Sequence, residues 1–161
     1  MLKVRDVMST PVVTVTQETL VKEAALLLAE KDISGVPVID SGQVVGIFSE
    51  ADVLRSIKTT KKDLRLVFPS VSSLGIAFQE DVTQREILEA YAEIGTKPVK
   101  DVMSKDVVTV GPDMPLNEAV VQMVRKGISR LPVVDKRELV GIISRGDVIR
   151  GLAREQPAKT P

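Results

Sequence analysis

The sequence contains GIISRGDV at residues 141–148 and a close counterpart, GIFSEADV, at residues 46–53. An offset of 95 positions separates the two stretches, and the same offset aligns residues 6–55 with residues 101–150 without a gap. In those 50 positions 23 residues are identical, where about three would be expected from average residue frequencies. The period is too long for a solenoid repeat. The chain is therefore an internal duplication of one small unit.

Each copy shows the same order of expected elements. A short β-rich run comes first, Val12–Val15 or Val107–Val110, and an amphipathic helix follows, for which Pro115 suits the first helical position. The apolar stripes of these helices are Leu20, Ala24, Leu27 and Leu28 in the first copy and Leu116, Ala119, Val120, Met123 and Val124 in the second. Two strands joined by a turn and a final helix complete the unit.

In the first copy the strands are expected at Val36–Ile39 and Val44–Phe48, with Asp40-Ser41-Gly42 as the turn. The final helices begin at Ser49 and Ser144. Such a β-α-β-β-α unit cannot cover both faces of its own small sheet. We therefore predict a layered α/β (α+β) fold in which the tandem repeats pack about a pseudo-twofold axis.

The duplication predicts four segments along the chain. They are a first repeat at 1–57, an inter-repeat linker with a helical portion at 58–96, a second repeat at 97–152 and a mobile tail at 153–161. Within the linker, residues 66–78 carry no charge but are too short to span a membrane. We expect them to cover an apolar surface of the repeats or a subunit interface. Residues 79–94 predict a helix.

The composition excludes several classes of function. Lys plus Arg and Asp plus Glu both total 22, which argues against a duplex nucleic acid as partner. Histidine and cysteine are absent, so a Ser-His-Asp triad and a His/Cys zinc site are impossible. No nucleophile with an activating base can be assembled, so we expect neither an enzyme nor a metal site. Without an apolar run long enough to cross a bilayer, the protein is expected in the cytoplasm, away from membranes.

The stretch Ser144-Arg145-Gly146-Asp147 fits two interpretations. Ser-x-x-Asp before an apolar run is a capping box, worth about 1 kcal/mol to the helix it starts. The same helix N-terminus can also hold a phosphate, which Arg145 could contact with its guanidinium. An aspartate at this position can accept hydrogen bonds from the two hydroxyls of a ribose. With so few aromatic residues, a planar ring would have to lie between aliphatic side chains.

The motifs DVMS, VxTV, ISxxPVxD and GIxSxxDV occur in this order in both copies. In kind, order and spacing they resemble the CBS domain family, over residues 1–57 and 97–152, and pairs of such domains are called Bateman modules. The chain looks like a stand-alone pair. The resemblance implies a regulatory module that binds an adenosine-containing ligand, such as AMP, ADP, ATP or S-adenosylmethionine, and needs no cofactor. It also implies a homodimer that signals to a protein partner.

The resemblance further implies two ligand pockets in clefts between the repeats. One would use Ser144, Arg145, Asp147 and Ile142, facing Val13, Ile33 and Ser34; the other would use Ser49, Asp52 and Ile47, facing Val108, Ile128, Ser129 and Arg130. Each aspartate would be open to the cleft and hold the ribose, while the serines and basic residues hold phosphate. The apolar members of both sets fit a purely structural role in the core equally well.

The two pockets are not expected to be equivalent. Position 50 carries Glu where position 145 carries Arg, so the Arg145 pocket should favour the more anionic ligand. The family often places a histidine where Ser34 and Ser129 stand, which argues against strong binding of multiply phosphorylated ligands. The alternative interpretation is a structural or protein-interaction module whose pockets bind no ligand and whose Ser-x-x-Asp motifs are only helix caps.

Overall fold

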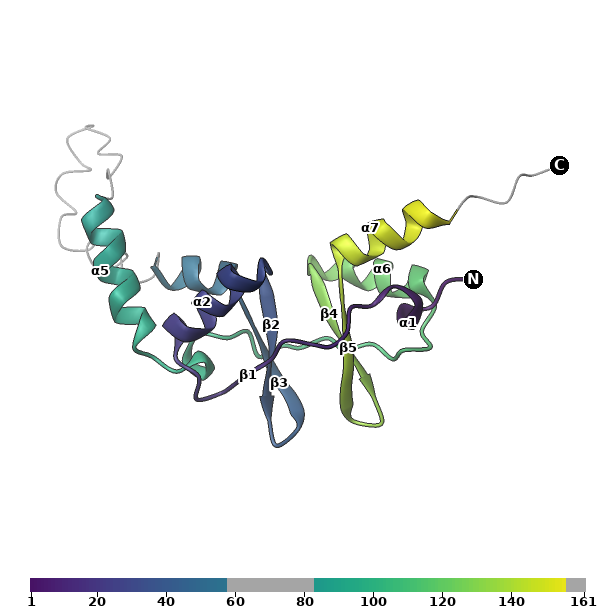
Figure 1. Cartoon of the computed structure of the whole chain (residues 1–161), viewed down its shortest axis with the longest axis horizontal. Coiled ribbons are helices and arrows are strands. Elements are labelled where there is room, and N and C mark those ends of the chain that lie inside the picture. Colours follow the sequence, from purple (N-terminus) through teal and green to yellow (C-terminus); the bar gives the residue numbers. More distant parts are fainter. Residues whose placement is uncertain (58–82, 156–161) are drawn as a thin grey trace. The chain divides into compact units, whose positions relative to one another are not determined.

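The computed structural model describes residues 1–57 and 83–155, and Figure 1 traces the chain. The helices are α1 (Val4–Val7), α2 (Val21–Lys31), a helix at residues 50–57, α5 (Gln84–Gly95), the 3₁₀ helix η1 (Val99–Asp101), α6 (Leu116–Lys126) and α7 (Arg145–Arg154). The strands are β1 (Val15–Thr16), β2 (Gly35–Asp40), β3 (Gln43–Ser49), β4 (Arg130–Asp135) and β5 (Glu138–Ser144).

The fold is a mixed α/β arrangement with small sheets, as the duplicated pattern predicts. One sheet has the strand order β1-β2-β3 and the other pairs β4 with β5. The first strand of each copy is shorter than the predicted runs Val12–Val15 and Val107–Val110. β1 covers only Val15 and Thr16, and in the second copy Val110 makes a single parallel bridge to Val133. Val12 and Val13 are half-buried without being part of a strand, so their apolar character reflects burial rather than pairing.

The two hairpins turn through residues with a positive φ. In the β2–β3 hairpin these are Ser41 and Gly42, with φ of 51° and 78°, which agrees with the predicted turn. In the β4–β5 hairpin they are Lys136 and Arg137, with φ of 48° and 68°. Two successive residues with positive φ form the tight turn that matches the twist of a hairpin. The β4–β5 hairpin therefore adopts a turn conformation that glycine favours, although its residues Lys136 and Arg137 carry side chains that disfavour a positive φ.

α6 begins one residue later than the sequence predicts. α6 starts at Leu116, directly after Pro115, so the proline precedes the first helical residue rather than occupying it. Leu116, Ala119 and Met123 are buried as the stripe predicts. Val124 is 76% exposed, so the apolar stripe of α6 is wider than the face that it buries.

α5 begins at Gln84 because Thr83 forms a capping box with Glu86. The hydroxyl of Thr83 accepts from the amide of Glu86 at 3.3 Å, and the Glu86 carboxylate accepts from the amide of Thr83 at 2.8 Å. The predicted helix at 79–94 is thus confirmed from Gln84 onward, while residues 79–82 lie outside the described part of the chain. The uncharged segment 66–78 lies outside it as well.

The chain forms two compact units, and each draws on both copies of the repeat. Among the described residues, unit 1 comprises 1–14, 37–47 and 105–155, and unit 2 comprises 15–36, 48–57 and 83–104. The spatial units therefore do not follow the order of the sequence. The four segments proposed from the sequence stay a prediction about the repeats, not about these units.

The core of unit 1 combines the second copy of the repeat with the beginning of the chain. Its buried members are Val4, Val110, Leu116, Ala119, Met123, Leu131, Val133, Ile143 and Val148. Val4 of α1 is fully buried, and its amide donates to the carbonyl of Met114 at 2.9 Å. The amide of Leu116 donates in turn to the carbonyl of Leu2 at 2.9 Å. Residues 1–9, the first leading segment, thus belong to the core formed by the second copy.

Unit 2 repeats this arrangement with the copies reversed. η1 precedes the second copy in sequence, yet Val99 is fully buried and donates from its amide to the carbonyl of Thr19 at 2.7 Å. The amide of Val21 at the start of α2 donates to the carbonyl of Lys97 at 2.9 Å. Residues 97–104, the second leading segment, therefore pack on the first copy. Each repeat has exchanged its leading segment for that of the other.

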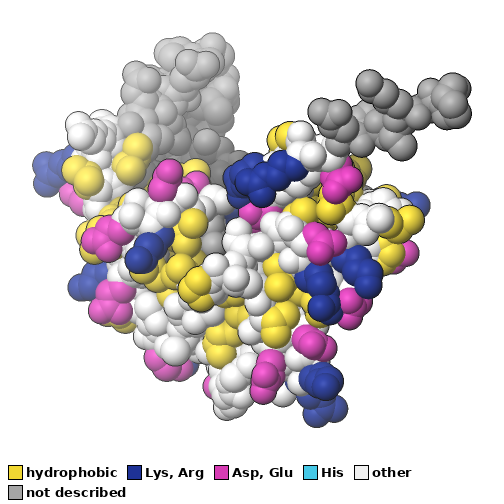
Figure 2. Space-filling model, turned by 45° about the vertical axis from the view of Figure 1, so that its right-hand side comes forward, with side chains coloured by type: hydrophobic (Ala, Val, Ile, Leu, Met, Phe, Trp, Pro, Cys, Tyr) yellow, Lys and Arg dark blue, Asp and Glu magenta, His cyan; other side chains and the backbone are white. Residues whose placement is uncertain are grey.

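The surface shows mixed charge on the face seen in Figure 2, where Lys and Arg side chains alternate with Asp and Glu. Among the described residues, no helix combines the length and apolar character needed to cross a membrane.

Candidate functional site

Asp147 lies at the start of α7 in unit 1 and forms the predicted capping box with Ser144. The Oδ2 atom of Asp147 accepts from the amide of Ser144 at 2.8 Å and from its hydroxyl at 2.9 Å. The amide of Asp147 donates back to the Ser144 hydroxyl at 3.2 Å. The structural interpretation of this motif is thus confirmed: Ser144 and Asp147 satisfy the free amides of the first helical turn.

The second carboxylate oxygen of Asp147 has partners that the capping box does not need. Its Oδ1 accepts from the hydroxyl of Ser9 at 2.8 Å and from the Nη2 of Arg150. Ser9 ends the first leading segment and is held in place by its backbone, which exchanges hydrogen bonds of 2.8 and 3.1 Å with Ile142. The DVMS motif of the first copy thus contacts the cap of the second.

Asp52 in unit 2 has the same set of partners. Its Oδ2 accepts from the amide and the hydroxyl of Ser49 at 2.9 and 3.0 Å. Its Oδ1 accepts from the hydroxyl of Ser104 at 2.9 Å and from the Nη2 of Arg55. Ser104 and Arg55 correspond to Ser9 and Arg150 under the offset of 95. The duplication has therefore preserved a four-donor arrangement around each carboxylate.

The burial and hydrogen bonding of Asp147 act on its pKa in opposite directions. Asp147 is 4% exposed, and burial by itself raises the pKa of a carboxyl group. The hydrogen bonds from the Ser144 amide, from the hydroxyls of Ser9 and Ser144 and from Arg150 lower it, and together they hold the pKa below its ordinary value. Asp147 is therefore a buried carboxylate kept in its charged form.

This geometry differs from the expectation that each carboxylate is open to a cleft. Asp52 and Asp147 are 3% and 4% exposed. A carboxylate has about four positions that can accept a hydrogen bond, and in both cases four donors occupy them. A ribose hydroxyl could therefore bind only by replacing one of the present donors.

The polar residues assigned to the pockets lie next to the cap of their own copy. The amide of Arg145 donates to the carbonyl of Ser129 at 3.1 Å, and the amide of Glu50 donates to the carbonyl of Ser34 at 3.0 Å. Arg130 stands opposite Ser144 in the β4–β5 register. Arg145 and Glu50 are both exposed, so the charge difference between the two copies lies at the surface.

The apolar residues assigned to the pockets are all half-buried: Val13, Ile33, Ile47, Val108, Ile128 and Ile142. Val108 and Ile128 pack against the core of unit 1, so for these two a structural role is established. That the apolar residues of one copy face the Ser-x-x-Asp motif of the other stays a prediction.

The sequence interpretation missed four residues that contact the two carboxylates. Ser9 and Ser104 are the last residues of the DVMS motifs, and Arg55 and Arg150 stand three positions after each aspartate. All four are identical between the copies. That identity was the available signal, because exposed positions that stay the same in both copies of a duplicated unit are candidates for a shared contact.

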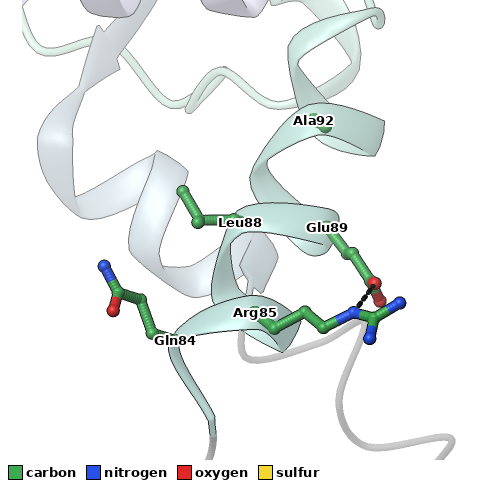
Figure 3. Close-up of a pocket in the computed structure, with 5 residues that line it drawn as sticks. All are labelled: Gln84, Arg85, Leu88, Glu89 and Ala92. Atoms are coloured by element: carbon green, nitrogen blue, oxygen red, sulfur yellow. Dashed lines mark hydrogen bonds and ion pairs between the residues drawn. The ribbon is translucent and has the colours of Figure 1, made fainter.

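The surface of α5 carries a shallow depression (Figure 3), which is lined by Gln84, Arg85, Leu88, Glu89 and Ala92. Arg85 and Glu89 form an ion pair across one turn at 3.0 Å. The depression is wide open and contains none of the residues assigned to the pockets. Within residues 1–57 and 83–155, no group of three or more acidic side chains is placed to hold a metal ion.

Comparison with known proteins adds independent findings. The CBS domain model matches residues 4–59 and 99–154. The chain is 36% identical over 152 residues to the protein MJ1426 of Methanocaldococcus jannaschii, covering 92% of this chain and 90% of that protein. The solved CBS domain pair of MJ0100, in complex with 5′-methylthioadenosine and S-adenosyl-L-methionine, is 25% identical, with a TM-score of 0.66 over 95% of this chain and 97% of that one.

A second solved structure, CBSX2 in complex with AMP, is 26% identical, with a TM-score of 0.69 over 96% of this chain and 98% of that one. Both solved proteins thus carry adenosine-type ligands on the same kind of fold.

Proposed function

The chain belongs to the CBS domain family and contains two CBS repeats, and on this premise we propose that it is a non-catalytic regulatory module that binds an adenosine-containing ligand. The ligand would bind beside the starts of helix 50–57 and α7. The observation that carries the proposal is the matching arrangement at Asp52 and Asp147, two buried carboxylates with the same four kinds of donor. A carboxylate of this kind can exchange a donor for a ribose hydroxyl.

The relatives support the same class of ligand. MJ0100 binds 5′-methylthioadenosine and S-adenosyl-L-methionine, and CBSX2 binds AMP. The apolar residues near the two motifs, such as Ile33 and Ile128, offer the aliphatic surfaces that would enclose an adenine. The presence of ligand would be passed to a protein partner. A cytoplasmic location remains an expectation from the sequence.

The two binding positions should differ in their preference for charge. Arg145 follows Ser144 at one position, where Glu50 follows Ser49 at the other, and both are exposed. A phosphate beside Arg145 gains a favourable electrostatic interaction, and a phosphate beside Glu50 meets repulsion. We therefore expect a titration with AMP to resolve two unequal classes of site. Two equivalent sites would contradict this assignment.

Thermal unfolding tests the proposal with a panel of AMP, ADP, ATP, S-adenosylmethionine, 5′-methylthioadenosine and the guanine nucleotides as a contrast. A ligand at 100 times its dissociation constant stabilises the native state by about 2.7 kcal/mol. For a chain of this size, that should raise the midpoint of thermal unfolding by about 5–10 °C. A response to adenosine compounds and not to guanine nucleotides is the expected result.

The matched variants for this test are Asp147→Asn and Asp6→Asn. Both aspartates accept from the amide three residues earlier, at 2.8 Å in each case, but Asp6 caps the short helix α1 and belongs to no proposed site. Asp147→Asn should reduce the ligand-induced shift, and Asp6→Asn should leave it intact. If no compound shifts the wild-type midpoint, the alternative of a structural or interaction module with ligand-free pockets is favoured.

We also propose that the protein forms a homodimer through its helices. Large apolar side chains are exposed at equivalent positions of both copies: Leu26 and Val121 on α2 and α6, and Leu54 and Ile149 on helix 50–57 and α7. Exposed apolar surface that recurs at symmetric positions is typical of a self-association face. Sedimentation should show a dimer that Leu54→Glu with Ile149→Glu dissociates, while Lys136→Glu in the β4–β5 turn leaves it intact. A monomeric wild-type protein would exclude the dimer.

A further inference from the structure

Two exposed arginines donate hydrogen bonds to the buried carboxylates of Asp147 and Asp52. Arg150 donates from Nη2 to Oδ1 of Asp147, and Arg55 donates from Nη2 to Oδ1 of Asp52. In each pair the aspartate side chain is only 3–5% exposed, whereas the arginine side chains are 62% and 65% exposed. The arginines are therefore the part of each cluster that reaches into solvent.

The other donors are much harder to replace. At Asp147 the Oδ2 atom is taken by the amide and hydroxyl of Ser144, which fix the start of α7. On Oδ1 the hydroxyl of Ser9 belongs to a residue whose backbone is paired with Ile142 in both directions. Arg150, by contrast, is joined to the cluster through a long side chain with many rotamers. Its guanidinium already lies in solvent and can be hydrated when it moves away, so Arg150 is the donor that leaves most easily.

We propose, on the basis of the ligand-binding function above, that Arg150 is a specificity-determining residue that exchanges its carboxylate for the phosphate of an incoming nucleotide. A ribose hydroxyl takes the place of the guanidinium on Oδ1 of Asp147. The displaced guanidinium then needs a new anion. A nucleoside monophosphate supplies one within the same ligand, and an unphosphorylated nucleoside does not.

In this exchange Arg150 competes with adenosine for the carboxylate of Asp147, but it binds the phosphate of AMP. For adenosine, the ribose has to displace Arg150 and leaves its charge without a counterpart. For AMP, the loss of the Arg150–Asp147 pair is offset by a charge-assisted contact between guanidinium and phosphate. This exchange at Arg150 is distinct from the contrast between Arg145 and Glu50, which lies in the residue after each serine cap.

Calorimetric titration of adenosine and of AMP tests the exchange on the wild type and on Arg150→Ala. The variant should bind adenosine about two- to fivefold more tightly, since a weak competing ion pair has been removed. It should not bind AMP more tightly, because the phosphate loses its partner. The preference for AMP over adenosine should therefore fall by at least the same factor.

Arg154→Ala is the matched control, because Arg154 lies one turn further along α7 and its side chain is not a donor to Asp147. It should leave both dissociation constants within about twofold of the wild type, the range expected of an exposed charge. Unchanged or weaker adenosine binding in Arg150→Ala would overturn the exchange. If the wild type binds neither compound, the proposed function itself fails, and the two failures are thus distinguished.

A measurement without ligand tests the contact on which the exchange depends. Carbon-13 NMR of the Asp147 carboxyl group during a pH titration reports its pKa directly. Since the hydrogen bond from Arg150 is one of those that lower the pKa of Asp147, Arg150→Ala should raise it, and Arg154→Ala should leave it unchanged. An Asp147 titration that Arg150→Ala does not move would show that the pair is absent in solution and would also overturn the exchange.

Discussion

Replacing Asp147 by alanine should lower the free energy of unfolding by about 3 kcal/mol, because the amide and hydroxyl of Ser144 and the hydroxyl of Ser9 all lose their acceptor at a partly buried site. At 2–4 °C per kcal/mol, the midpoint of thermal unfolding should fall by roughly 6–12 °C. Urea denaturation at neutral pH measures the change. The side chain thus has a structural role that any ligand-binding assay of this variant must take into account.

Asp113→Ala is the control for this loss, since Asp113 belongs to the same unit and forms ion pairs with Lys3 and Arg5 while being 66% exposed. Surface pairs of this kind contribute about 0–1 kcal/mol. An effect of Asp147→Ala as small as that of Asp113→Ala would contradict the four-donor arrangement around the buried carboxylate.

The contribution of Asp147 should also depend on pH. Because its pKa is lowered in the folded protein, the stabilisation is fully present above the ordinary aspartate pKa of about 3.9 and is lost as the pH falls through the lowered value. The difference in stability between the wild type and Asp147→Ala should therefore be constant near neutrality and shrink below about pH 4. A difference that grows in acid would have the wrong sign.

Gly151→Val should destabilise the protein by about 2 kcal/mol, the middle of the range for forcing extra atoms into a packed contact. A Cβ atom on Gly151 of α7 would lie 2.4 Å from Cγ1 and 3.2 Å from Cβ of Val7 in α1. The Val7 side chain is branched at Cβ and has little freedom to move away. The whole first leading segment would have to shift, which would weaken the burial of Val4 and the contact of Ser9 with Asp147.

Two further variants separate this contact from a general effect on α7. Gly146→Ala lies in the same helix, and its Cβ would lie 3.2 Å from the flexible end of Arg150 and at an ordinary contact distance of 3.7 Å from Oγ of Ser144, so it should be neutral or slightly stabilising. Val7→Ala should partly restore the stability of Gly151→Val in a double-mutant cycle. Independent, additive effects of the two substitutions would show that α1 and α7 do not touch at this point.

Much of the fold follows from local patterns in the sequence. The offset of 95 predicts the duplication, and alternating apolar runs around Ser41-Gly42 predict the β2–β3 hairpin. Ser144 and Asp147 predict their own cap, because all the groups involved lie within four residues of each other. Local hydrogen bonds of this kind are encoded by spacing alone. The starts of α6 and α7 and the β2–β3 hairpin were therefore predictable to within one or two residues, whereas the helix predicted from residue 79 begins only at Gln84.

The exchange of leading segments could not be predicted in the same way. DVMS is identical at residues 6–9 and 101–104, so nothing in the motif indicates which copy it packs on. The contacts of Ser9 with Asp147 and of Ser104 with Asp52 span 138 and 52 positions. Arg55 and Arg150 escaped notice for a different reason: they stand only three residues after their aspartates, but an exposed arginine near a helix start is usually a solvated side chain. Placing these residues required the three-dimensional structure.

The position of α1 in the core of unit 1 has a consequence for the order of events during synthesis. Val4 leaves the ribosome long before Leu116, Ile143 and Val148, with which it is buried. Residues 1–9 must therefore wait without their binding surface until Val148 has been made. Since closing so long a loop is entropically unfavourable, we expect this segment to dock late in the folding of unit 1.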